Sequence, residues 1–111
     1  MNKYRTHNCY QLNEKDIGKL VNLSGWLHRK RDHGNLLFID IRDHYGITQC
    51  VIENNNKFFS VLEKIRSESV IKIAGKVVAR TKETENLDLK TGKIEVSINS
   101  IEILSEAKEL P

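Results

Sequence analysis

The chain has 111 residues, of which 39% are hydrophobic and 30% are charged, a composition typical of one globular domain. The net charge is +3, and because the last eleven residues hold a net −2, residues 1–100 carry +5. No apolar run approaches the roughly 20 residues that span a bilayer, and the first residues lack the apolar core of a signal peptide. We therefore expect a cytoplasmic protein with no membrane partner.

Hydrophobic periodicity predicts five strands and one helix. In the predicted strands, apolar residues recur at every second position and form one face, as Leu37, Ile39 and Ile41 do in the second strand. Gly25 and Gly75 lie inside predicted strands, which is typical of a bulge or a tight bend in a barrel. In chain order we expect a short helical turn within 13–19, strands at 19–28, 36–42 and 47–53, a helix at 57–67, a strand at 70–80, a polar loop at 81–91 and a last strand after the turn at 92.

This order of elements indicates the fold class. Three strands, a helix and two strands predict an all-β protein with one helix, namely a five-stranded OB-fold Greek-key barrel whose helix lies between strands three and four. Another small α+β barrel is the alternative. We expect residues 1–111 to form one OB-fold domain, with 1–18 as an N-terminal extension.

Strand parity places an aromatic side chain on the outer face of this barrel. If Leu37 and Ile39 point inward, Phe38 points outward, and Gln49 on the next strand is placed outside because an amide is awkward to bury. A ring can stack on any base for about 1–3 kcal/mol, and an amide can pair with a base edge. The basic run 28–31 adjoins this face, so we predict binding of single-stranded RNA. The alternative is that Phe38 is buried under a loop or the N-terminal segment.

Motifs for other chemistry are missing from the sequence. The four histidines are scattered without metal-ligand spacing, and Cys9 and Cys50 are far apart, which favours free thiols. The sequence contains no glycine-rich phosphate loop and no nucleophile elbow. Asp40 and Arg42 share the outer parity of one strand, which favours a local ion pair rather than an acid–base couple. We therefore expect no catalytic residue, no metal and no cofactor in this domain.

Five segments together resemble a known family over essentially the whole chain. The chain looks like the N-terminal anticodon-binding domain of bacterial-type aspartyl-tRNA synthetases, and lysyl and asparaginyl relatives share the pattern in looser form. The segments are RTHNC at 5–9, GWLHRKRDHG at 25–34, FIDIRD at 38–43, GITQCV at 46–51 and TGKIEV at 91–96. The resemblance also makes residues 105–111 similar to the start of the hinge before a class II catalytic domain that this chain lacks.

The resemblance implies a role for each matching residue. Phe38 would stack on the central anticodon uracil, Gln49 would hydrogen-bond its edge, and Glu95 would read the first-position guanine. The basic residues implied to bind the anticodon loop are Arg29, Arg31 and Arg80, and Lys30 in the same basic run is expected to contact phosphate.

The parent enzyme implied by the resemblance attaches aspartate to tRNA(Asp) with ATP and Mg²⁺, and it forms a homodimer through the absent domain. His33 stands in a turn where relatives specific for the aspartate tRNA often carry leucine, and where relatives that also charge tRNA(Asn) often carry histidine. Thr84 stands where relatives often carry asparagine. The alternatives are a sequence-tolerant single-strand-binding OB protein, the anticodon domain of a lysyl or asparaginyl relative, and an OB domain used only for protein contacts.

Overall fold

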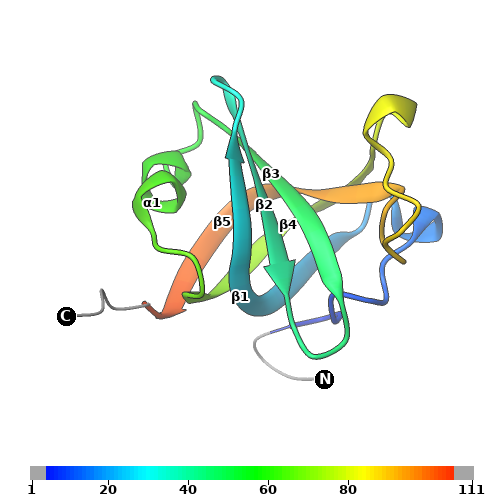
Figure 1. Cartoon of the computed structure of the whole chain (residues 1–111), viewed down its shortest axis with the longest axis horizontal. Coiled ribbons are helices and arrows are strands. Elements are labelled where there is room, and N and C mark those ends of the chain that lie inside the picture. The colour runs from blue at the N-terminus through cyan, green and yellow to red at the C-terminus, as the bar shows by residue number, and fades with distance from the viewer. Residues whose placement is uncertain (1–4, 107–111) are drawn as a thin grey trace.

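The computed structural model describes residues 5–106, which form five strands, one α-helix and two single-turn 3₁₀ helices (Figure 1). Residues 1–4 and 107–111 lie outside the described part of the chain, so most of the predicted hinge segment 105–111 does too. In chain order the elements are η1 (Glu14–Asp16), β1 (Leu20–Asp32), β2 (Leu36–Arg42), β3 (Ile47–Glu53), α1 (Phe59–Lys64), β4 (Val70–Ala79), η2 (Lys82–Thr84) and β5 (Ile94–Ser105).

The strands close into a barrel in the order β1-β2-β3-β5-β4, with β1 also paired to β4. All neighbouring strands are antiparallel except β3 and β5, which pair in parallel. The predicted five-stranded OB-fold with a helix between the third and fourth strands is confirmed. Closure leaves no long unpaired strand edge among the described residues, which such short strands would otherwise expose to other chains.

The barrel interior is filled by the alternating apolar side chains of every strand. Helix α1 covers one end of the barrel, where Leu62 and Ile65 are buried (Figure 1). Burial of side chains of this size stabilises the fold by about 1.5–3 kcal/mol each. The core comprises Cys9, Leu12, Val21, Leu23, Leu27, Leu37, Ile39, Ile41, Cys50, Ile52, Leu62, Ile65, Ile71, Ile73, Val77, Ile94, Val96 and Ile98.

Strand β1 is longer than the predicted 19–28. It pairs first with β4, up to Trp26, and then with β2, as far as Asp32. Its last residues pair with β2 alone and rise as a two-stranded hairpin (Figure 1), and the apolar alternation of β1 stops there. The β-bulge lies between Leu27 and Arg29, and the register does not shift at Gly25, where a bulge or a tight bend was expected. Gly25 is instead a site of close approach, because a Cβ there would overlap the carbonyl oxygen of Arg42.

Three other predicted features can be compared with the structure: the bulge at Gly75, the length of the helix and the end of the last strand. The bulge expected at Gly75 is confirmed, since the β4–β5 register shifts between Ala74 and Gly75. Helix α1 is shorter than 57–67 because the chain becomes extended at Ile65. Strand β5 continues to Ser105, since its second half pairs with the start of β4.

The described part of the predicted N-terminal extension packs on the barrel. Cys9 and Leu12 are fully buried. The Cys9 amide donates to Asp43 Oδ2 at 2.8 Å, and Thr48 Oγ1 donates to the Cys9 carbonyl at 3.0 Å. These bonds hold the segment against the β2–β3 turn. Among residues 5–106, no helix is long and apolar enough to cross a membrane.

Candidate nucleic-acid interface

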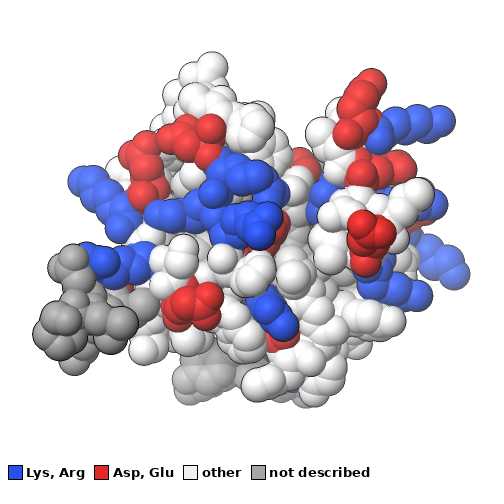
Figure 2. Space-filling model, viewed as in Figure 1, with Lys and Arg blue, Asp and Glu red and all other residues white. Residues whose placement is uncertain are grey.

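The outer surface of β1, β2 and β3 carries the predicted binding residues. Arg31 lies opposite Phe38 in the β1–β2 ladder, and Arg29 lies opposite Asp40. Asp40 in turn lies opposite Gln49 of β3. Figure 2 shows that Lys and Arg side chains gather on this side of the molecule, below the tip of the β1–β2 hairpin. Arg29 is exposed, and it is therefore free to reach a phosphate or a base.

Phe38 is half-buried on this outer face. The exposed His33 ring from the hairpin turn meets it edge-on, with ring centroids 5.2 Å apart and an interplanar angle of 79°. This T-shaped contact is a favourable aromatic geometry, and it fixes one edge of the phenyl ring. His33 and Phe38 therefore form one aromatic surface near the tip of the hairpin.

A chain of side-chain hydrogen bonds joins four strands beside Phe38. Arg31 of β1 donates through Nη1 and Nη2 to the two carboxylate oxygens of Asp40, at 3.2 and 3.4 Å. Its Nη2 also donates to Gln49 Oε1 at 2.6 Å. Gln49 Nε2 donates to Glu95 Oε1 of β5 at 2.8 Å. The parallel pairing of β3 and β5 brings Gln49 and Glu95 together, although they are 46 residues apart in sequence.

These contacts fix the orientation of the Gln49 amide. An arginine can only donate and a carboxylate can only accept, so Oε1 must face Arg31 and Nε2 must face Glu95. Gln49 lies on the predicted outer face but is only 6% exposed, because Arg31 and Glu95 cover it. One lone pair and one N–H of the amide remain. A uracil edge, with one N–H donor between two carbonyl acceptors, complements that pair of groups.

Arg80 lies buried near this network. Its Nε donates to the Ile94 carbonyl at 2.9 Å and its Nη1 to the Thr84 carbonyl at 3.0 Å, while Nη2 is buried without a hydrogen-bond partner. Burial lowers the pKa of Arg80, and the nearby carboxylates of Glu95 and Asp40 oppose that shift. An unpaired buried donor is costly, and a ligand would reach Nη2 only after the side chains that cover it move.

Lys30 does not face the same way as its arginine neighbours. It lies opposite Ile39, whose side chain is buried, and its ammonium reaches the C-terminal end of α1. Nζ donates to the carbonyls of Leu62 at 3.3 Å, Glu63 at 3.0 Å and Ile65 at 2.6 Å. These bonds occupy all three donors of the ammonium. The phosphate contact expected of Lys30 would require at least one of them to break.

Asp40 is the member of this hydrogen-bonded network that sequence reasoning missed. Instead of pairing with Arg42 on its own strand, its carboxylate pairs with Arg31 across the β1–β2 ladder, and its side chain is only 14% exposed. Arg31 is a diagonal neighbour of Asp40, whose direct ladder partner is Arg29, so this pair could be found only from the β1–β2 register. Asp40 positions the guanidinium that in turn orients Gln49.

The remaining sequence expectations concern cysteines and metal sites. Cys9 and Cys50 are both buried free thiols, and burial raises the pKa of each. Within residues 5–106, no three His, Cys, Asp or Glu side chains gather in a way that would hold a metal ion.

A family model described as the OB-fold nucleic acid binding domain matches residues 21–104. The chain belongs to this family. It is 66% identical over 111 residues to the aspartate–tRNA(Asp/Asn) ligase of Pelagibacter ubique (strain HTCC1062) and 57% identical to that of Phenylobacterium zucineum (strain HLK1). Each comparison covers 100% of this chain but only 19% of the relative.

A solved structure contains a region with the same fold. The chain is similar to the crystal structure of asparaginyl-tRNA synthetase from Pyrococcus horikoshii, with a TM-score of 0.79 and 28% sequence identity. The similarity covers 95% of this chain and 24% of that one. The chain therefore matches about a fifth to a quarter of the length of these much longer proteins.

Proposed function

We propose that this chain is the anticodon-binding domain of an aspartate–tRNA ligase. The hydrogen-bonded chain from Arg31 through Gln49 to Glu95, beside the half-buried ring of Phe38, carries the proposal. This arrangement supplies a stacking surface, an amide of fixed orientation and a carboxylate acceptor within one small region of the barrel. Those are the groups that discriminate the edges of unpaired bases in RNA.

The central anticodon uracil would stack on Phe38 and pair with the free positions of the Gln49 amide. Glu95 has one carboxylate oxygen beyond its bond to Gln49, and that oxygen would accept the amino and imino protons of a first-position guanine. Arg31 would contact the bases from the other side. The exposed Arg29 is better placed than the engaged Lys30 to neutralise a phosphate.

Arg80, which directly follows β4, would contact the anticodon loop and hold it in place. Its Nη2 is buried without a hydrogen-bond partner among the described residues, so a carbonyl or phosphate oxygen of RNA would satisfy it once the side chains that cover it move aside. The nearby carboxylate of Glu95 favours the charged guanidinium.

His33 bears on which tRNA is accepted. Its ring contacts Phe38 from the hairpin turn, so it would border the nucleotide that follows the central base. The relatives reported above are named for both tRNA(Asp) and tRNA(Asn). We therefore propose that the parent enzyme charges tRNA(Asp) and also accepts tRNA(Asn).

The parent enzyme would attach aspartate to tRNA with ATP and Mg²⁺ in the cytoplasm, in a catalytic domain outside these 111 residues, through which it would form a homodimer. The chain spans 19% of the length of its curated relatives, which supports a catalytic domain encoded elsewhere in the parent. The fragment alone is expected to bind tRNA and not to aminoacylate it.

Substitution of Phe38 tests the proposal. Phe38→Ala should weaken binding of an anticodon stem-loop by about 1–3 kcal/mol, because a stacking surface is lost, while thermal stability changes little. Phe58→Ala is the matched control: Phe58 packs against the core beside α1, so its loss should lower stability without changing affinity. Binding is measured by fluorescence titration and stability by circular dichroism.

The same titration separates the rival functions. Equal affinity for the stem-loop and for oligo-dT would favour the sequence-tolerant single-strand binder. No binding of either would favour an OB domain used for protein contacts. A Phe38→Ala variant that unfolds at a much lower temperature but binds normally would make Phe38 a core residue and remove the proposed interface.

A further inference from the structure

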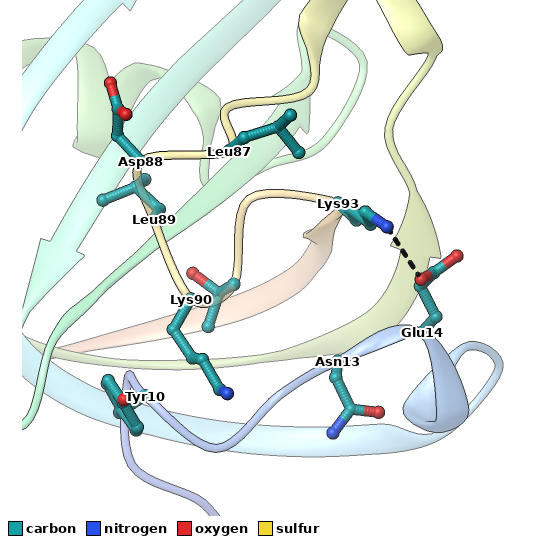
Figure 3. A pocket seen from close by; sticks show the side chains of 9 residues that line it. Tyr10, Asn13, Glu14, Leu87, Asp88, Leu89, Lys90 and Lys93 are labelled. Carbon is teal, nitrogen blue, oxygen red and sulfur yellow. Dashed lines mark ion pairs between the residues drawn. The ribbon is translucent and has the colours of Figure 1, made fainter.

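Two adjoining hollows lie at the edge of the barrel where the N-terminal segment meets the β4–β5 loop. Their volumes are about 590 and 380 Å³, and both are lined by Tyr10 and by the loop residues Asp88, Leu89 and Lys90. Figure 3 shows the larger of the two. The Lys93–Glu14 ion pair, at 3.6 Å, closes the far side of the larger one. None of the roles proposed above uses these hollows.

The smaller hollow continues the proposed anticodon-binding face. Arg42 and Ile47 line it, and they lie opposite each other in the β2–β3 ladder. Arg42 shares the outer parity of β2 with Phe38, and Ile47 shares the outer parity of β3 with Gln49. A strand of RNA that leaves the Phe38 surface along these two strands would therefore pass directly into the hollow.

Both walls of the hollow are fixed before any ligand arrives. On one side, Tyr10 follows Cys9, whose backbone is held by Asp43 and Thr48. On the other side, Thr91 Oγ1 donates to the Ile47 carbonyl at 2.6 Å and ties the loop to β3. A ligand would therefore not bear the full entropic cost of ordering these segments.

The chemistry of the walls suits a nucleotide. The Tyr10 ring is 50% exposed, and the ammonium of Lys90 lies over it, 5.9 Å from its centroid. Arg42 is exposed, and no ion pair or hydrogen bond joins its guanidinium to another described side chain. Two carboxylates also line this hollow. Asp43 is buried and accepts hydrogen bonds from backbone N–H groups, whereas Asp88 is exposed, so two exposed cations face one exposed carboxylate. An aromatic face beside two cations is the arrangement that binds a base and its phosphate.

We propose that this hollow binds one unpaired nucleotide adjacent to the anticodon triplet, with its base on Tyr10 and its phosphate against Lys90 and Arg42. The inference rests on the proposed function, because it extends the same RNA path beyond the Phe38 surface. It assigns a binding role to Tyr10 and Lys90, which the sequence pattern did not single out.

The experiment uses the 111-residue chain and a set of anticodon stem-loops. One stem-loop is intact, and each of the others has a single abasic nucleotide at one loop position outside the triplet. Tyr10→Ala should weaken binding of the intact RNA about five- to tenfold, whereas Tyr10→Trp should keep the affinity. At one flanking position the abasic RNA should already show the loss, and Tyr10→Ala should add nothing there.

Lys90→Ala provides a second arm that does not depend on Tyr10. It should weaken binding and flatten the salt dependence more than Lys76→Ala, which removes the charge of another exposed lysine, on β4. Equal effects of the two lysine variants would mean that Lys90 acts only through non-specific electrostatic attraction, and this result would overturn the proposal. Effects of Tyr10→Ala that add to every abasic substitution would overturn stacking on this ring.

Phe38→Ala distinguishes failure of this inference from failure of the proposed function. If Phe38→Ala weakens binding and Tyr10→Ala does not, the hollow binds no nucleotide but the anticodon face stands. If neither variant changes affinity, the anticodon-binding proposal falls as well.

Discussion

Replacement of Lys30 separates a structural role from a phosphate contact. Lys30→Met keeps a flexible apolar side chain of similar length but removes the ammonium that donates to the carbonyls of Leu62, Glu63 and Ile65. These carbonyls lie at the C-terminal end of α1, where the helix dipole favours a cation. We therefore expect a loss of stability, with the RNA-binding surface left largely intact.

The magnitude follows from partial burial. A cation at a helix C-terminus contributes about 0.3–1 kcal/mol when exposed and up to about 2 kcal/mol in partly buried geometry. Lys30 is partly buried, and that burial lowers the pKa of its ammonium, which offsets part of the gain. We expect a net loss of about 1–2 kcal/mol, equivalent to a melting temperature lower by roughly 5–10 °C for a domain of this size.

Thermal unfolding by circular dichroism and stem-loop titration at two salt concentrations measure the two roles. Lys64→Met is the matched control, because Lys64 is an exposed residue of α1 and its replacement also removes one positive charge. Lys30→Met should unfold at a lower temperature than this control, with the same salt dependence of binding. Unchanged stability together with a flatter salt dependence would refute the structural role and restore the phosphate contact.

Two further predictions concern base readout and acid stability. Gln49→Ala should narrow the difference in affinity between stem-loops with uracil and with cytosine at the central anticodon position, because the oriented amide is lost. Titration of four stem-loops that differ only at that base tests this prediction. Equal binding of all four by the unaltered chain would contradict anticodon reading. Asp16 Oδ2 accepts a hydrogen bond from the backbone N–H of Asn13 at 3.0 Å, which lowers the pKa of the Asp16 carboxyl group. A lowered folded-state pKa stabilises the fold above the unfolded value of about 3.9, and this stability is lost as the pH falls through the folded value. Asp16→Asn should therefore be less stable than the unaltered chain at pH 7, with a difference that shrinks below about pH 4 in acid titrations followed by circular dichroism; a constant difference would exclude the linkage.

The local sequence pattern determined the fold and much of the proposed RNA-binding face. The bounds of β2 and β3 agree with the predictions at both ends, because alternation and turn residues such as Gly34 and Gly46 set them without long-range information. Parity alone also placed Phe38 on the outer surface. The helix and the ends of β1 and β5 were less well predicted, since their limits depend on what the segments pack against.

Tertiary structure decided which member of the basic run faces the ligand. Simple alternation from the buried Leu27 would put Arg29 and Arg31 on the core side of β1. The bulge after Leu27 inserts one extra residue and reverses this parity, so both arginines share the outer face while Lys30 turns toward α1. Likewise, only barrel closure pairs β3 with β5 and brings Glu95 to Gln49. Residue types and periods are local properties of a sequence, whereas register and closure arise from contacts between segments far apart in it.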